Sequence, residues 1–251
     1  MKTTLKLLSL AIILAVVYII YILFSPNPDK LNYVALGDSI AEGMNSYNAI
    51  DYGYADYISD HLKNQKKLGT YTKSFSKSGY TTENLTNDIN NNKSIVDPKT
   101  NKTINIKEAL RESHLVTISI GANDLIKGSS IQTFANKIEN IIETKEEIDQ
   151  IAIKVEELLI LVKQYAKNQV ILIGYYNPLP LITNYKSQIN EIVVYANEKY
   201  SEIAKKLEID YVDVFDVFNS NPTFLPNPSN IHPNTKGYEA ISKEIIKKIA
   251  N

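Results

Sequence analysis

The chain of 251 residues contains no cysteine, only three histidines and no excess of positive charge. The absence of cysteine excludes disulfides, thiolate zinc sites, lipoprotein-type acylation and a cysteine nucleophile. A net charge of −1 argues against a nucleic-acid partner, which would normally bind a basic face. The sequence also lacks a Gly-Lys-Ser/Thr phosphate loop, a Gly-x-Gly-x-x-Gly motif and a His-Glu-x-x-His motif. We therefore expect neither a cofactor nor a metal.

The N-terminus carries an uncharged apolar stretch of 18 residues, Leu7 to Phe24. This length is at the lower end of what spans a bilayer as a helix. Lys2 and Lys6 precede it and favour an inside N-terminus. A cleaved signal peptide is the alternative, but the stretch ends in bulky residues, where a cleavage site needs small ones. We expect one transmembrane helix in a single-pass membrane protein, or a secreted protein if the stretch is cleaved.

The sequence divides into an anchor with a short linker, residues 1–28, and one folded domain, residues 29–251. The folded domain has 25 basic and 28 acidic residues, a net charge of −3. Such a charge gives no general attraction to anionic lipid. The N-terminal helix alone is then expected to hold the domain at the outer side of the membrane.

From residue 33 onward, short apolar runs alternate with helical patterns, which predicts a mostly parallel five-stranded sheet covered on both faces, an α/β class fold. The predicted strands are Tyr33–Leu36, Tyr71–Ser76, Leu115–Ile120, Val170–Ile173 and Tyr211–Val214. The predicted helices are Tyr54–Leu62, Ile131–Ile142, Ile148–Tyr165, Ile189–Leu207 and Thr235–Ile249, and residues 90–103 are read as a surface loop with a small hairpin. Residues 143–147 would link the predicted helices 131–142 and 148–165, which form either a helical hairpin beside the cleft or an ordinary crossover.

Four polar blocks carry residues suited to catalysis. Ser39, in Gly-Asp-Ser, directly follows the first strand, and Gly79 and Asn123 follow the second and third. The carboxyl ends of parallel strands form one edge, where sites in such sheets lie. His232, in Ile-His-Pro-Asn, could act as the base that a serine nucleophile needs, while Gly79 and Asn123 could donate hydrogen bonds to an oxyanion. Taken singly, these residues fit a helix cap or turns equally well.

With these four blocks in order, the chain resembles the SGNH, or GDSL-type, hydrolases, in a membrane-anchored bacterial form. The resemblance covers about residues 32 to 250. It implies a three-layer α/β/α sandwich of flavodoxin type. It also implies a Ser39 nucleophile, a His232 base, and an oxyanion hole formed by Ser39, Gly79 and Asn123. His61 and His114 lie in no such motif.

One position departs from the family pattern. The family usually has an aspartate three residues before the histidine, and here that residue is Ser229. Ser229 or a backbone carbonyl could orient the ring of His232 instead, as could Asp213 or Asp216. The triad could therefore be a dyad with slower turnover.

The resemblance implies a carboxylic ester hydrolase, of esterase, lipase or lysophospholipase type, that acts through an acyl-enzyme. Its substrate would be a small-molecule, lipid or glycan ester. A carbohydrate or cell-wall O-acetyl esterase would share every catalytic residue and is the alternative. The missing aspartate motivates an alternative of another class, a non-catalytic envelope binding protein on the same fold. The sequence does not indicate an oligomeric state.

Overall fold

The computed structural model describes residues 30–97, 101–126 and 137–249. The expected membrane anchor, residues 1–28, lies outside these ranges. Within them, none of the helices combines the length and the hydropathy that a bilayer crossing requires. All the elements described below belong to the unit Leu31–Asn251.

The centre of the domain is a five-stranded sheet with the order β2-β1-β5-β6-β7, in which all neighbouring strands are parallel. This confirms the predicted fold class. The strands are β1 (Leu31–Gly37), β2 (Leu68–Thr72), β5 (Leu115–Ser119), β6 (Gln169–Ile173) and β7 (Asp210–Val212). The register pairs Gly37 with Ser119 at the ends of β1 and β5. The loops that carry Ser39 and Asn123 therefore leave the sheet at the same edge.

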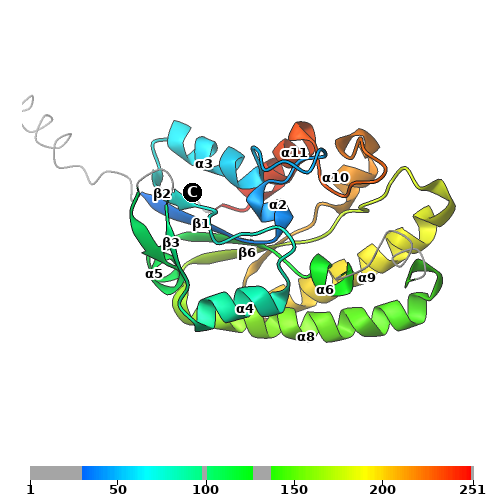
Figure 1. Cartoon of the computed structure of the whole chain (residues 1–251), viewed down its shortest axis with the longest axis horizontal. Coiled ribbons are helices and arrows are strands. Elements are labelled where there is room, and N and C mark those ends of the chain that lie inside the picture. The colour runs from blue at the N-terminus through cyan, green and yellow to red at the C-terminus, as the bar shows by residue number, and fades with distance from the viewer. Residues whose placement is uncertain (1–29, 98–100, 127–136, 250–251) are drawn as a thin grey trace, which may run out of the picture. The chain divides into compact units, whose positions relative to one another are not determined.

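Helices cover both faces of the sheet, as Figure 1 shows. One face packs against α3 (Tyr54–Asn64), α10 (Phe215–Asn219) and α11 (Thr235–Ile246). The other face packs against α4 (Thr82–Asn90), α5 (Ile106–Glu112), α8 (Ile141–Tyr165) and α9 (Lys186–Lys206). Short helical segments connect these elements: α2 (Ser39–Glu42), α6 (Ala122–Ile126), η1 (Thr183–Tyr185) and η2 (Pro222–Phe224).

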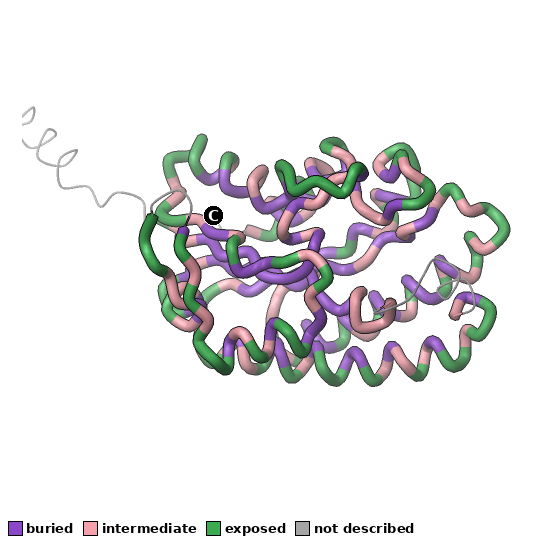
Figure 2. The backbone as a smooth tube through the Cα atoms, in the orientation of Figure 1, coloured by how far each residue is buried: buried purple, intermediate pink, exposed green. Residues whose placement is uncertain are grey.

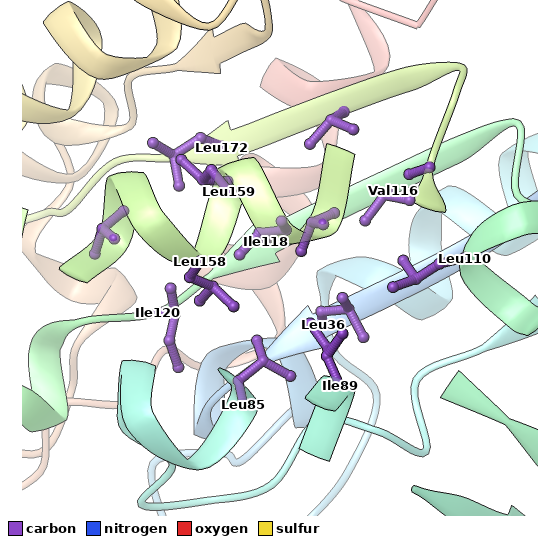
Figure 3. Packing of buried hydrophobic residues seen from close by; sticks show 14 of the residues in the cluster. Leu36, Leu85, Ile89, Leu110, Val116, Ile118, Ile120, Leu158, Leu159 and Leu172 are labelled. Atoms are coloured by element: carbon purple, nitrogen blue, oxygen red, sulfur yellow. The ribbon is translucent and has the colours of Figure 1, made fainter. Parts of the chain in front are cut away.

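The sheet is hydrophobic on both faces because its strands are buried between two helical layers. All five residues of β5 are buried, and Figure 2 shows that buried backbone is concentrated in the strands and on the inward sides of the helices. In the cluster of Figure 3, Leu36, Val116, Ile118 and Leu172 lie on the sheet and face side chains of α4, α5 and α8. This core holds the strand ends, and therefore the site, in place.

Two sequence predictions differ from the structure. The strand predicted at 71–76 is β2, which begins at Leu68 and ends at Thr72, because its pairing with β1 stops at Val34↔Thr72. The chain then turns, and the Ser76 hydroxyl donates to Ala35 O. The predicted linker at 143–147 is part of one continuous helix, α8. That segment contains neither glycine nor proline, so nothing in it stops a helix. Residues 131–136 of the predicted helix 131–142 lie outside the described residues, whereas residues 137–139 are helical and Ile141 begins α8.

The expected hairpin in the loop 90–103 is present as β3 (Ser94–Val96) and β4 (Thr103–Asn105), which pair antiparallel. Residues 98–100, between these strands, are not described. The hairpin does not contribute to the site.

Candidate active site

Ser39 is the first residue of α2, placed by a sharp turn out of β1. Gly37 has φ +139°, and a Cβ at this position would lie 1.9 Å from Ser119 O, so only glycine fits. Asp38 then caps α2 by accepting a hydrogen bond from the N–H of Ile40, at 3.0 Å. The result is a largely buried serine, 7% exposed, whose backbone N–H stands at a helix start.

His232 lies in the loop before α11, and its ring reaches Ser39 across 193 positions of sequence. The Nε2 of His232 is 2.8 Å from Ser39 Oγ, a hydrogen-bond distance. Tyr176 supports this loop, because its hydroxyl donates to Ile231 O at 2.9 Å. A serine hydroxyl paired with an imidazole is the arrangement that a nucleophile and its general base require.

The other ring nitrogen of His232 is held by Asn230. Nδ1 lies 2.6 Å from Asn230 Oδ1, and the same oxygen accepts the backbone N–H of His232 at 2.9 Å. The Asn230 amide nitrogen donates to Ser46 O at 3.1 Å and to Asn48 Oδ1 at 2.9 Å. Asn230 is only 5% exposed, so these contacts are shielded from water.

These contacts determine the orientation of the Asn230 amide and the tautomer of His232. A backbone N–H can only donate and the Ser46 carbonyl can only accept, so the amide oxygen must face the imidazole. Nδ1 therefore carries a hydrogen, and this N–H donates a hydrogen bond to Asn230 Oδ1. Nε2 is therefore left as an acceptor that faces the hydroxyl of Ser39, the tautomer that a base needs.

The orienting contact differs from the sequence expectation, which gave this place to Ser229. Ser229 is exposed, and its N–H donates to Asn227 Oδ1 at 3.0 Å. Asp213 and Asp216 are exposed as well, and Asp213 accepts from the N–H of Phe215. The partner was missed because it lies two positions before the histidine, where the side chain folds back onto the backbone in an Asx turn. Asparagine at an Asx position was the signal in the sequence.

Burial without a carboxylate partner makes His232 a weaker base than usual. Desolvation lowers the pKa of His232 from 6.5 to about 4, because the charged imidazolium is disfavoured away from water. The negative charge of an aspartate beside Nδ1 would raise the pKa of His232 again, whereas the neutral amide of Asn230 raises it less. The ring is therefore neutral at physiological pH.

The loop that carries Gly79 is attached to the loops on either side. Glu42 of α2 accepts a hydrogen bond from the backbone N–H of Ser78 at 2.6 Å. On the other side, the Asn123 amide donates one hydrogen to Tyr80 O at 2.9 Å and keeps its second hydrogen. These two bonds bring the Gly79 and Asn123 blocks to the same strand edge as Ser39.

The backbone of Gly79 adopts φ +79°, a left-handed conformation that favours glycine. A Cβ added there would meet no atom within 4 Å, so the position is open as well as exposed. Among the described residues, the N–H groups of Ser39 and Gly79 have no hydrogen-bond acceptor. Both remain available to an anionic oxygen, together with the second amide hydrogen of Asn123.

Two aspartates brace these loops. Burial raises the pKa of Asp38 to about 7, although its hydrogen bond from Ile40 favours the charged form. Asp124 accepts the N–H of Thr82 at 2.9 Å and its hydroxyl at 2.6 Å, which links α6 to the start of α4. Both side chains are occupied by neighbouring donors, as expected for supports of the site.

The remaining histidines lie elsewhere. His61 contacts Gln65 on α3, and His114 Nδ1 accepts the N–H of Asn32 at the start of β1. Across residues 30–97, 101–126 and 137–249, no cluster of three or more histidine, aspartate or glutamate side chains could hold a metal ion.

The model of the GDSL-like lipase/acylhydrolase family matches residues 35–240. Among solved structures, the lipase Lip_vut3 from a goat rumen metagenome is similar, with a TM-score of 0.68 and 20% identity over 87% of this chain and 97% of that chain. No match was found among curated proteins.

The acetylxylan esterase Axe2 from Geobacillus stearothermophilus is also similar, with a TM-score of 0.59 and 17% identity over 90% of this chain and 97% of that chain. Structures of catalytic mutants of Axe2, in which a serine, an aspartate or a histidine is replaced, are similar too. At these identities the structural likeness establishes a shared fold.

Proposed function

The chain belongs to the GDSL-like lipase/acylhydrolase family and is a hydrolase of carboxylic esters, and we propose that Ser39 is its nucleophile and His232 its general base. The observation that carries this proposal is the 2.8 Å contact between Ser39 Oγ and His232 Nε2. Family membership favours this enzyme over a non-catalytic binding protein on the same fold.

The tautomer of His232 sets the direction of proton transfer. Nε2 takes the hydroxyl proton of Ser39 as Oγ bonds to the ester carbonyl carbon, and then gives that proton to the departing alcohol. Water, deprotonated by the same nitrogen, then attacks the acyl carbon; the bond to Ser39 Oγ breaks, Nε2 returns the proton to Oγ, and the acid is released. Asn230 Oδ1 accepts a hydrogen bond from the Nδ1–H group throughout the reaction and so positions the ring.

The negative charge that develops on the carbonyl oxygen needs fixed donors. The N–H groups of Ser39 and Gly79 and the side-chain amide of Asn123 supply them. Removing one such donor typically costs about 3 kcal/mol of transition-state stabilisation. Asp38 carries less negative charge near pH 7 than an ordinary aspartate does, because burial raises its pKa to about 7.

Asn230, and not an aspartate, contacts Nδ1 of His232. A neutral amide fixes the tautomer but stabilises the imidazolium less than a carboxylate does. We therefore assign a Ser–His dyad with an asparagine as positioning residue.

The location of the protein is a separate part of the proposal. Residues 7–24 have the length and uniform hydropathy of a membrane-spanning helix, and Lys2 and Lys6 favour an inside N-terminus. Residues 29–251 would then form the hydrolase domain on the outer side. Protease digestion of intact cells tests this: the domain should be cleaved while a cytoplasmic marker survives, and a protected domain would contradict it.

A second candidate is a carbohydrate O-acetyl esterase, which the similarity to the esterase Axe2 supports. It would use the same Ser39 and His232. The two functions differ in the acyl group they accept, which is a property of the space beside Ser39.

The proposed chemistry is tested with the full chain in detergent and p-nitrophenyl esters. Ser39→Ala should reduce kcat by about 10⁴-fold or more, the scale seen when a serine nucleophile is removed. Ser201→Ala is the matched control, because Ser201 is an exposed serine on α9, and it should leave kcat unchanged. Equal activity of Ser39→Ala and the wild type would contradict the proposal.

A further inference from the structure

A cavity of about 210 Å³ opens at Ser39 and extends between the strand ends and the paired helices α8 and α9. Its lining includes Ser39 and Asn123, the proposed nucleophile and one proposed oxyanion donor. Most of the lining is apolar and includes Ile148, Ile151, Leu179, Ile192, Val193 and Ala196.

The tyrosine hydroxyls in the lining are already paired. The hydroxyls of Tyr175 and Tyr200 lie 2.7 Å from each other and 2.6 and 3.0 Å, respectively, from Ile120 O, so each has a hydrogen-bond partner. Among the described residues that line the cavity, Asp38 is the one carboxylate, and it directly precedes Ser39 in the chain. A sugar would find few free partners inside, whereas a hydrocarbon chain would leave no polar group unsatisfied.

The position of His232 decides which half of an ester enters. Ser229 and Ile231 line the cavity but His232 does not, although its Nε2 contacts Ser39. The alcohol oxygen must lie beside Nε2 to receive the proton, so the alcohol half extends toward His232. The acyl half extends from the same carbonyl carbon in another direction, and the cavity is the space available to it.

We infer that this cavity is an acyl-chain pocket that selects medium-chain esters, an inference that rests on the proposed function of Ser39. An apolar cavity of about 150 Å³ holds one benzene molecule, about six carbons. At the same density, the 210 Å³ here corresponds to a chain of about eight carbons. An acetyl group would leave most of the cavity empty, and a much longer chain would not fit inside.

One face of α9 provides the means of testing this. Ile192, Ala196 and Tyr200 are spaced four residues apart, so they lie on one side of the helix, and all three line the cavity. Ala196 is the smallest of them, and Ala196→Phe would place a ring inside the cavity. Val194 lies on the same helix but is 38% exposed, which makes Val194→Phe a matched control.

The experiment measures kcat/KM of the full chain on p-nitrophenyl esters from acetyl through butyryl, hexanoyl, octanoyl and dodecanoyl to hexadecanoyl. Each methylene buried should raise kcat/KM about fourfold, up to a chain of about eight carbons, and longer chains should lose activity. Ala196→Phe should lower the octanoyl-to-acetyl ratio by about tenfold or more. Val194→Phe should leave the ratio unchanged.

A preference for acetyl esters, or an octanoyl-to-acetyl ratio that Ala196→Phe does not change, would overturn the inference while leaving the Ser39 chemistry intact. If Ala196→Phe does not fold, Ile148→Ala serves instead: it enlarges the cavity and should move the optimum to longer chains. An unmoved optimum would again overturn the inference.

A binding measurement separates this inference from the proposed function. Calorimetry with Ser39→Ala should show sodium octanoate binding more tightly than sodium acetate, and the difference should vanish when Ala196→Phe is added. This result would support the cavity even if no ester were hydrolysed. Equal affinity for the two acids would count against the cavity even in an active esterase.

Discussion

His232 Nδ1 lies 2.6 Å from the side-chain oxygen of Asn230, a neutral amide two positions before it in the chain. The contact fixes the imidazole with its acceptor nitrogen toward Ser39. It also leaves a half-buried base without a counter-charge. The behaviour of this site should therefore differ from that of a Ser–His–Asp triad in ways that can be measured.

Replacement of Asn230 should affect turnover more than binding. Asn230→Ala removes the acceptor of a hydrogen bond that becomes charged in the transition state, and such bonds are worth roughly 1.5–3 kcal/mol. We expect kcat to fall about 10- to 100-fold with little change in KM. Steady-state kinetics on one ester checks this, and a change confined to KM would show that Asn230 does not position the base.

Asn230→Asp should restore the counter-charge at a cost in stability. A carboxylate would raise the pKa of His232, but one of its oxygens would then face Ser46 O and Asn48 Oδ1, which are acceptors. We expect the free energy of unfolding at pH 7 to fall by about 1–3 kcal/mol. Urea denaturation measures the loss.

Asn227→Asp is the matched control for this substitution, because Asn227 also donates to Ser46 O but has no contact with the ring of His232. Asn227→Asp should destabilise the protein without changing the pH at which kcat/KM falls on the acid side. If this pH shifted equally in Asn230→Asp and Asn227→Asp, the contact with Asn230 would not determine the basicity of the ring.

The pH profile follows from the lowered pKa of His232. The base must be neutral, and burial keeps it so down to about pH 4. We expect kcat/KM to stay level from neutral pH to about pH 5 and to fall with a midpoint near 4. A midpoint near the ordinary histidine value of 6.5 would contradict the account.

The same shift predicts a stability trend. The pKa of His232 is lower in the folded state than in the unfolded state, so the unfolded chain binds more protons between pH 4 and pH 6.5. The contribution of His232 to stability therefore falls as the pH decreases from 6.5 toward 4. Chemical denaturation at several pH values, compared with His232→Gln, isolates this contribution. The variant should lack this part of the pH dependence.

Loss of the Asn123 amide should lower turnover. Asn123→Ala removes one oxyanion donor, so kcat should fall about 10²- to 10³-fold while KM changes little. It also removes the bond to Tyr80 O, a loss of about 1 kcal/mol in stability. An unchanged kcat in a folded variant would remove Asn123 from the oxyanion hole.

The sequence predicted the fold through features that are local in the chain. The apolar runs at Tyr33–Leu36, Leu115–Ile120 and Val170–Ile173 became central strands, because a strand covered on both faces must be apolar throughout. The second strand was placed too late in the chain, since its pairing with β1 depends on register and not on its own composition. The strand order is likewise a property of packing that no single segment specifies.

The site was predictable to a different extent. Ser39 and His232 could be selected because each occurs in a short motif, and the structure places them in contact. For Asn230 the sequence offered only an asparagine at an Asx position, because its role depends on the rotamer of one buried side chain and on acceptors at Ser46 and Asn48, far away in sequence. The cavity was also beyond prediction, since its walls come from segments distant from one another along the chain.

Covalent labelling of Ser39 by a fluorophosphonate tests the central claim most directly, because the probe reacts only with an activated hydroxyl. We expect mass spectrometry of the full chain to show one adduct, located on the peptide that contains Ser39. Ser39→Ala should show none, and His232→Ala should label at least about 100-fold more slowly. A wild-type protein that stays unlabelled, or an adduct on any other residue, would contradict the account.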